Sequence, residues 1–166
     1  MIRVRAATQA DLPALTDLYN HYILNTPVTF DLEPYGPDGR RVWFDQHAET
    51  GPHRLLVAEQ DGEVLGYATS SRWRPKAAYD TTVETSVYCR HDATGRGVGT
   101  RLYDALFAAL ATENVHRIVA GMTLPNDASR ALHERFGFTH VGDFAEVGYK
   151  FGRYWDVAWF QRGMRL

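Results

Sequence analysis

The sequence predicts a mixed α/β fold around one mixed β-sheet, and three observations lead to it. Short apolar and β-branched runs alternate along the chain with longer stretches whose apolar residues recur at helical spacing. Two of the short runs, residues 55–58 and 64–68, flank Asp61-Gly62, a dipeptide typical of tight hairpins between antiparallel strands. Further on, a strand-like run, a glycine-rich loop, a helical stretch and a second strand-like run follow one another. Such a crossover makes its two strands parallel.

The size and composition of the chain are those of one domain. Its 166 residues are 45% hydrophobic and 13% aromatic, enough for a substantial core, so we expect a single domain over residues 1–166. The net charge of −2 without a Lys/Arg block argues against a nucleic-acid partner. Cys89 is the one cysteine, which excludes an intrachain disulfide framework. Because no run of about 18 apolar residues exists and the N-terminus lacks the apolar core of a signal peptide, we expect a soluble cytoplasmic protein with no membrane partner.

The N-terminal half begins with a strand and a helix. Residues 2–5 alternate in polarity as a strand does, and Thr8 with Asp11 resembles a capping box that opens a helix. Apolar residues fall on one face of that helix: Leu12, Leu15, Leu18, Tyr19, Tyr22 and Ile23. A second, weaker helix is expected from about Asp38 to Ala48, with Val42, Trp43 and Phe44. The hairpin strands follow it.

The C-terminal half alternates strands and helices. A β-branched run over residues 81–89 leads through the glycine-rich loop into a helix that begins near Val98, and residues 117–121 form the next strand. The inward face of that helix carries Leu102, Leu106, Phe107 and Leu110. Asn126 can cap a helix that runs through Arg135, and Gly137 fits the position after its end. An extended run from Phe138 and a last strand over residues 155–160 complete the sheet.

The loop Thr94-Gly95-Arg96-Gly97-Val98-Gly99 is the most informative functional signal. Glycines leave the backbone accessible to a ligand, and the unpaired N–H groups and dipole of a helix N-terminus attract phosphate. The Gly-Lys-Ser/Thr ending of a P-loop is missing, because Gly99 is followed by Thr100-Arg101. The third glycine of the dinucleotide fingerprint Gly-x-Gly-x-x-Gly is missing too. Its position is occupied by Thr100 if the motif starts at Gly95, and by Leu102 if it starts at Gly97. The loop therefore favours a diphosphate ligand other than ATP or NAD, and a loop that only makes a tight turn is the alternative.

The order of these motifs resembles the GNAT superfamily of acyl-CoA N-acetyltransferases. The shared features are a strand, the Gly-x-Gly-x-Gly loop at a helix start, the next strand, and the segment from Asn126 through Leu132-His133-Glu134-Arg135-Phe136-Gly137-Phe138. Within the superfamily the chain is similar to the phosphinothricin and methionine sulfoximine acetyltransferases. That similarity rests on Asn20-His21-Tyr22, Ala78-Tyr79-Asp80, Thr82-Val83-Glu84, Leu124-Pro125-Asn126-Asp127, Gly148-Tyr149-Lys150 and Trp155-Asp156-Val157. The resemblance implies a mostly antiparallel sheet with one parallel, splayed strand pair and helices on both faces.

The resemblance makes acetyl-CoA the expected co-substrate, without a metal. It implies that amides of the loop bind the pyrophosphate, that the backbone of the preceding strand binds the pantetheine arm, and that a residue before the next helix also bonds the cofactor. The matching residues are Thr94, Gly95, Arg96, Gly97, Val98, Gly99 and Thr100 for the pyrophosphate, Val87, Tyr88 and Cys89 for the arm, and Asn126. Relatives usually begin the loop with Gln or Arg. The shorter side chain of Thr94 therefore predicts weaker binding, and Arg96 adds a positive charge nearby.

Two residues are the expected catalytic ones. Transfer of an acetyl group to an amine requires a base for the ammonium proton and favours an acid for the departing thiolate. Glu84 lies mid-strand, where partial burial would raise the pKa of its carboxyl group, and it matches the family's proposed base. A carboxylate that faces solvent is the alternative. His133 stands where many superfamily members have a tyrosine that acts as the acid, and the roles of acid, base and positioning group all stay open.

The expected substrate is a small amino acid with a glutamate-like, sulfone or sulfoximine side chain. Cations just before the catalytic strand suit an α-carboxylate, and hydroxyl groups on that strand suit a polar side chain. The expected substrate-binding residues are Phe30, Arg74, Lys76, Tyr79, Thr85 and Ser86, with Trp73 beside them. A solvated basic loop over residues 72–76 is the alternative.

Two other functions stay open. The enzyme could acetylate another amine, such as an aminoglycoside, a polyamine or a protein N-terminus, or the chain could be a CoA-binding sensor without turnover. Cys89 lacks a paired histidine and is not expected to be a nucleophile, and the seven histidines lack metal-ligand spacing. The resemblance also implies a homodimer that uses the aromatic segment from Tyr154 to Phe160, and a role in herbicide or antibiotic resistance.

Overall fold

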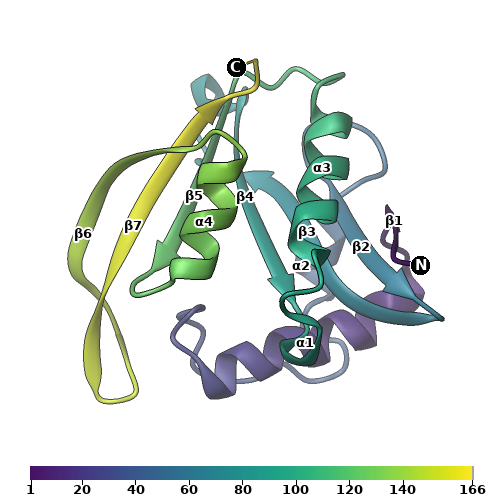
Figure 1. Cartoon of the computed structure of the whole chain (residues 1–166), viewed down its shortest axis with the longest axis horizontal. Helices are drawn as coiled ribbons and strands as arrows, with labels where there is room; N and C mark the ends of the chain where they lie inside the picture. Colours follow the sequence, from purple (N-terminus) through teal and green to yellow (C-terminus); the bar gives the residue numbers. More distant parts are fainter. Residues whose placement is uncertain (166) are drawn as a thin grey trace.

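A computed structural model describes residues 1–165 as one seven-stranded sheet with helices packed against it (Figure 1). The strands are β1 Arg3–Ala6, β2 Leu55–Gln60, β3 Glu63–Arg72, β4 Thr82–Cys89, β5 Arg117–Thr123, β6 Thr139–Lys150 and β7 Arg153–Gly163. The α-helices are α1 Leu12–Asn25, α2 Arg41–Asp45, α3 Val98–Leu110 and α4 Asp127–Arg135, and the short 3₁₀ turns are η1 Gln9–Asp11, η2 Ala77–Tyr79 and η3 His91–Ala93. The order of strands across the sheet is β1-β2-β3-β4-β5-β7-β6.

The sheet is antiparallel except for one pair, as predicted. Strands β2 and β3 form the expected hairpin, in which Asp61 and Gly62 both have positive φ values, 54° and 82°. Two positive φ values are the signature of a type I′ turn, whose twist matches that of the strands it joins. Strands β4 and β5 are parallel, because α3 forms the crossover between them.

Strands β4 and β5 separate soon after they begin. Only residues 82–84 of β4 pair with residues 117–119 of β5, whereas β4 continues to Cys89 against β3 alone. Strand β5 continues to Thr123 against β7. Beyond Glu84, the edge of β4 that faces β5 therefore lacks a strand partner. This opening is the splayed strand pair that the family resemblance implied, and the N-terminal end of α3 and helix α4 lie beside it (Figure 1).

Helices cover both faces of the sheet. In β2, Leu56 and Ala58 belong to the apolar core formed with α3, whereas Leu55 and Val57 belong to a second cluster with α1. Alternate side chains of a strand point to opposite faces, so α3 and α1 lie on opposite sides. The predicted fold class is thereby confirmed. Among the described residues, no helix is long and apolar enough to cross a membrane.

Helix ends follow local signals closely at three places. Thr8 and Asp11 form the predicted capping box, although it opens the 3₁₀ turn η1 before α1 begins. Asn126 caps α4 by accepting a hydrogen bond from the Ser129 N–H at 3.1 Å. At the other end of α4, Gly137 has a φ of 80°, and the N–H groups of residues 137 and 138 donate to the carbonyls of residues 134 and 133. These bonds form a Schellman motif.

The second predicted helix is shorter than expected. It spans only Arg41–Asp45, because residues 37–40 form a turn that is bonded from Gly39 back to Gly36. The extended run after Phe138 becomes the long strand β6, which pairs with β7 through two irregularities of register. The last strand is longer than predicted, and its Phe160 is a core residue only 1% exposed.

Candidate active site

Two cavities meet at strand β4. The first, which we call the tyrosine pocket, has a volume of about 450 Å³ and is lined by residues that include Tyr19, Arg40, Tyr67, Ser71, Glu84 and Tyr88. The second, the splay cavity, has a volume of about 430 Å³ and lies among Val87, Cys89, Gly97, Gly121, Asn126 and His133. Ser86 and Tyr88 line both cavities. A molecule bound in one cavity can therefore reach a molecule bound in the other beside Ser86.

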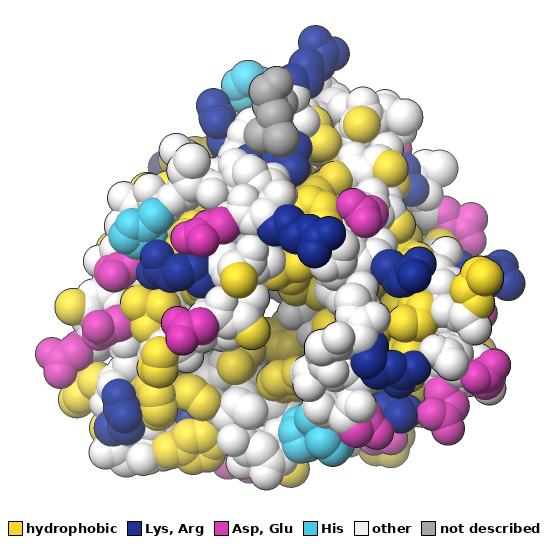
Figure 2. Space-filling model, viewed as in Figure 1, with side chains coloured by type: hydrophobic (Ala, Val, Ile, Leu, Met, Phe, Trp, Pro, Cys, Tyr) yellow, Lys and Arg dark blue, Asp and Glu magenta, His cyan; other side chains and the backbone are white. Residues whose placement is uncertain are grey.

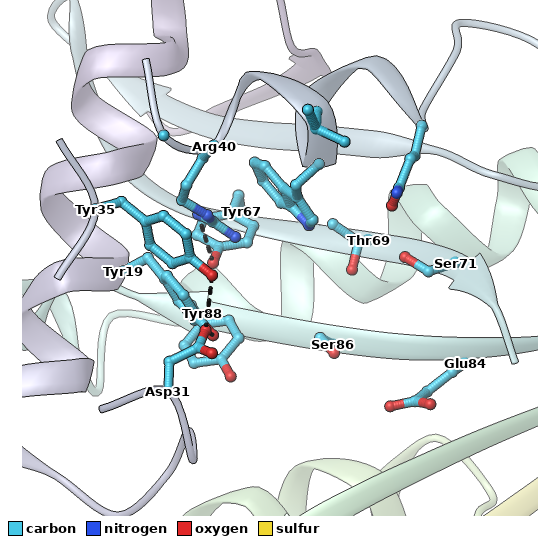
Figure 3. A pocket seen from close by; sticks show the side chains of 14 residues that line it. Tyr19, Asp31, Tyr35, Arg40, Tyr67, Thr69, Ser71, Glu84, Ser86 and Tyr88 are labelled. Carbon is cyan, nitrogen blue, oxygen red and sulfur yellow. Dashed lines mark hydrogen bonds between the residues drawn. The ribbon is translucent and has the colours of Figure 1, made fainter. Parts of the chain in front are cut away.

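Glu84 occupies the end of the tyrosine pocket that is nearest the splay. It lies opposite Ser71 in the pairing of β3 with β4, and its side chain shares a face with those of Ser86 and Tyr88 (Figure 3). The side chain is half-buried, and burial raises the pKa of the carboxyl group above its ordinary value, while the nearby charge of Arg74 acts in the opposite direction. Glu84 is thus a carboxylate whose affinity for a proton is increased, in the tyrosine pocket and two residues along β4 from Ser86, which lines both cavities.

The glycine-rich loop forms one wall of the splay cavity. Gly95 and Gly97 each have a φ of 76°, a left-handed conformation that other residues adopt only with strain. Gly97 directly precedes α3, so the unpaired N–H groups of the first helical turn lie at the cavity, where they can bind an anion. Figure 2 shows this region as a hollow with apolar side chains, between α4 and the loop.

Two side chains of the loop are engaged within the chain itself. The Thr94 hydroxyl donates to the carbonyl of His91 at 3.2 Å, and Arg96 Nη2 donates to Gln60 Oε1 at 2.8 Å. Arg96 therefore lies against the β2–β3 hairpin. These contacts leave the backbone as the main binding element of the loop.

His133 is buried in the wall of the splay cavity, with 4% of its surface exposed. Its Nδ1 lies 2.7 Å from the Ser129 carbonyl, which can only accept, so Nδ1 carries the hydrogen. Its Nε2 lies 2.9 Å from the Tyr103 hydroxyl and accepts from it. The Tyr103 hydroxyl is also 3.4 Å from Thr85 Oγ1. Burial lowers the pKa of the imidazole, so His133 is a neutral ring with both nitrogens bonded.

Comparison with known proteins identifies the family of this chain. The family model described as "Acetyltransferase (GNAT) domain" matches residues 4–159. The chain belongs to the GNAT acetyltransferase family. A phosphinothricin N-acetyltransferase from Streptomyces coelicolor is 57% identical over 163 residues, which cover 97% of this chain and 95% of that protein. An L-methionine sulfoximine/L-methionine sulfone acetyltransferase from Pseudomonas paraeruginosa is 39% identical over 158 residues, which cover 95% of this chain and 92% of that protein.

A solved structure of a relative has the same fold. The GNAT phosphinothricin acetyltransferase from Sinorhizobium meliloti, crystallised in complex with acetyl-CoA, superposes with a TM-score of 0.92 at 30% identity and covers 98% of this chain and 88% of that one. The predicted family and the predicted enzyme class, an acetyl-CoA-dependent N-acetyltransferase, are therefore confirmed.

The GNAT fold gathers some of the predicted site residues and separates others. Every residue predicted to bind the cofactor lines the splay cavity except Arg96. Ser86 lies beside Glu84, but Thr85 points to the opposite face, where it is buried against Tyr103. The predicted roles of these residues stay predictions.

The remaining predicted substrate contacts do not line the tyrosine pocket. The Arg74 guanidinium lies 4.9 Å from the Trp73 ring centroid, and exposed Tyr79 contacts Trp73 edge-on at 5.1 Å. Lys76 is exposed just before η2. Phe30 packs directly over Gly148 of β6, so closely that a Cβ at position 148 would lie 2.2 Å from its ring.

The structure also identifies site residues that sequence reasoning missed. Tyr103 could have been noticed as a hydroxyl group on the inward face of an apolar helix, beside Leu102 and Leu106. Arg40 could not have been noticed, because nothing in Arg40-Arg41 indicates which arginine is buried.

Cys89 has a pKa raised to about 11 by burial, which makes its thiol a poor nucleophile. Within residues 1–165, no group of three His, Cys, Asp or Glu side chains is arranged to hold a metal ion.

Proposed function

We propose that this GNAT enzyme acetylates the α-amino group of phosphinothricin, of methionine sulfoximine or sulfone, or of a close analogue. The observation that carries the proposal is the position of Glu84, a half-buried carboxylate of raised pKa in a polar, aromatic pocket, two residues from Ser86, where that pocket meets the splay cavity. A pocket of this size suits an amino acid. The names of two relatives, at 57% and 39% identity, support the same substrates.

The splay cavity fits acetyl-CoA at both of its ends. The positive φ values of Gly95 and Gly97 expose amides that can bind a pyrophosphate, and the unpaired edge of β4 beyond Glu84 offers backbone groups to the pantetheine amides. Val87, Tyr88, Cys89 and Asn126 are the further residues that would hold it. When bound there, acetyl-CoA supplies a thioester whose acetyl carbon an amine can attack, with CoA thiolate as the leaving group.

Glu84 acts as the general base in this proposal. An amino acid binds as an ammonium ion, which must lose a proton before its nitrogen has a free electron pair. The carboxylate accepts that proton through a water molecule, and the freed amine then attacks the acetyl carbon. As the C–N bond forms and the C–S bond breaks, the nitrogen loses its second proton, which protonates the departing CoA thiolate. A raised pKa makes Glu84 a stronger base than an exposed glutamate.

His133 serves as a positioning group. Its two nitrogens are bonded to Ser129 and Tyr103, and burial keeps the ring neutral, so it has no proton to donate toward the cavity. It fixes the Tyr103 hydroxyl beside Thr85, at the wall of the splay cavity. Many members of the superfamily have a tyrosine acid at this position. In the proposed mechanism, His133 instead orients the hydroxyl group of Tyr103 on α3.

An amine panel with acetyl-CoA and detection of released thiol tests the proposal. We expect turnover of phosphinothricin and methionine sulfone, and Glu84→Gln should lower kcat/KM by about 10²-fold because the base is lost. Glu134→Gln, an exposed change on α4, is the control and should keep full activity. Turnover of polyamines, aminoglycosides or peptides alone would overturn the substrate assignment, and thiol release at background for every amine would identify a sensor.

We further propose a homodimer as the working assembly. Six apolar or aromatic side chains on β6, β7 and the turn between them are 55–59% exposed: Val141, Phe144, Val147, Tyr149, Phe151 and Tyr154. Monomers rarely leave so many large apolar side chains in water on one element.

We infer in addition that residues 1–166 act as one domain and that the enzyme works in the cytoplasm, where its acetyl donor is available. We also infer that acetylation of phosphinothricin would confer resistance to that compound.

A further inference from the structure

Arg40 is a buried cation that the proposed mechanism does not use. Its side chain is 5% exposed, and its guanidinium carbon lies 3.9 Å from the ring centre of Tyr19 and 3.5 Å from that of Trp43. Within residues 1–165, its hydrogen bonds run only from Nη1, to the Leu15 carbonyl and the Tyr67 hydroxyl, both at 3.4 Å. Nε and Nη2 make none there, and the residue lines the tyrosine pocket. This pair of donors has the geometry that binds a carboxylate or phosphinate.

The acidic groups of the pocket leave the charge of Arg40 available. The Asp31 carboxylate accepts hydrogen bonds from the hydroxyls of Tyr19 at 2.5 Å and Tyr35 at 3.3 Å. It also lies near Lys150, where burial lowers the pKa of the ammonium group and the charge of Asp31 acts in the opposite direction. Glu84 stands at the other end of the pocket (Figure 3). Within residues 1–165 no carboxylate lies within ion-pair distance of Arg40. Among the described residues no fully buried side-chain nitrogen lacks a partner, so Nε and Nη2 keep contact with solvent in the pocket. An anionic ligand can replace that solvent with two charge-assisted hydrogen bonds.

The position of Arg40 indicates which anionic group it would bind. Its partner Tyr67 and the base Glu84 are separated by four residues along the paired strands, since Tyr67 lies opposite Tyr88 and Ser71 opposite Glu84. Four residues of strand span about 13 Å. Arg74 lies near enough to Glu84 for its charge to lower the pKa of that carboxyl group, so an amine beside Glu84 has its own α-carboxylate near Arg74. Only a group at the far end of the substrate then approaches Arg40.

We propose that Arg40 binds the distal anionic group of the substrate and so selects amino acids with a phosphinate or carboxylate side chain over those with a neutral sulfone. This inference rests on the proposed function, because it assumes an amino-acid substrate whose amine lies beside Glu84. The aromatic rings of Tyr19 and Trp43 pack against the guanidinium and hold its plane in place, and this less polar surrounding strengthens its bond to an anion.

The ratio of kcat/KM for phosphinothricin to kcat/KM for methionine sulfone tests this assignment. Arg40→Gln should lower the ratio at least about tenfold, because only phosphinothricin loses a charged partner. Arg40→Lys keeps the charge without the paired donors, and should lower the ratio less. Arg41→Gln removes the neighbouring, exposed arginine, which pairs with Asp38, and should leave the ratio unchanged.

A purely structural role for Arg40 gives a different result. Both substrates would then lose activity equally and the melting temperature would fall, and this outcome overturns the inference. If Arg40→Gln does not fold, the ratio measured with Arg40→Lys decides in the same way, and an unchanged ratio there overturns it. Turnover of neither amino acid by the unaltered enzyme overturns the proposed function itself, whereas turnover of both with an unchanged ratio in Arg40→Gln overturns only the assignment of Arg40.

Discussion

Burial acts in opposite directions on the pKa values of the two ionisable side chains nearest the proposed reaction. It raises the pKa of the Glu84 carboxyl group and lowers that of the His133 imidazole, because in both side chains the charged form is the one that loses water. Glu84 becomes a better base, and His133 becomes a neutral ring that accepts from Tyr103. One physical effect therefore supports a different proposed role for each of the two residues.

The pH dependence of kcat/KM should report the environment of Glu84. The proposed reaction needs the ionised carboxylate, so activity falls as the pH drops through the pKa of Glu84, at a pH above the ordinary glutamate value of about 4.3. Arg74→Gln removes a positive charge that lowers this pKa, so the acid limb should move to higher pH. This shift is checked by measuring the pH profiles of kcat/KM at saturating acetyl-CoA. Arg101→Gln, a change at an exposed arginine, is the control. An acid limb at the same pH in both variants would contradict the assignment.

At the scale of the element, local signals predicted the ends and pairings that depend on few residues. Asp61-Gly62 predicted the hairpin, and Asn126 with Gly137 predicted both ends of α4, because each signal is a backbone conformation or a hydrogen bond within a few residues. The burial of Arg40 depends on α1 and β3, which are distant in sequence. Thr85 and Ser86 point to opposite faces of the sheet because side chains alternate along a strand. Which of these faces lines the tyrosine pocket, however, depends on how the whole sheet is packed.

The glycine-rich loop gives a prediction at this scale. In Gly97→Ala, a Cβ at a φ of 76° is strained by about 1–2 kcal/mol, even though no neighbouring atom would touch it. We expect the loop to shift out of the conformation that exposes its amides, so the KM for acetyl-CoA should rise about tenfold or more. Gly36→Ala is the control, because position 36 has free space. The KM for acetyl-CoA is measured from initial rates at varied acetyl-CoA concentration. An unchanged KM in Gly97→Ala would show that the backbone at this position does not hold the pyrophosphate.

At the scale of the whole molecule, the two ends of the sheet differ. The end with β1, β2 and β3 carries the α1 and α3 cores on its two faces, whereas β6 and β7 at the other end leave large side chains exposed. In Figure 1 the β6–β7 hairpin extends beyond α4, with no helix over its tip. The predicted aromatic segment is divided accordingly, because Phe160 is core and Tyr154 is 58% exposed. The surface available to a partner is therefore the outer part of the hairpin.

The exposed surface of the β6–β7 hairpin is the basis of the proposed dimer. A stable interface buries about 800 Å² per partner, an area that large exposed side chains on a long hairpin can supply. We expect a dimer by size-exclusion chromatography with light scattering, and Phe144→Glu combined with Phe151→Glu should convert it to a monomer, because two charges would be buried in the contact. Leu24→Glu on α1, at 57% exposure, is the matched control and should stay dimeric. A monomeric unaltered enzyme at micromolar concentration would refute this interface, and so would a double variant that remains a dimer.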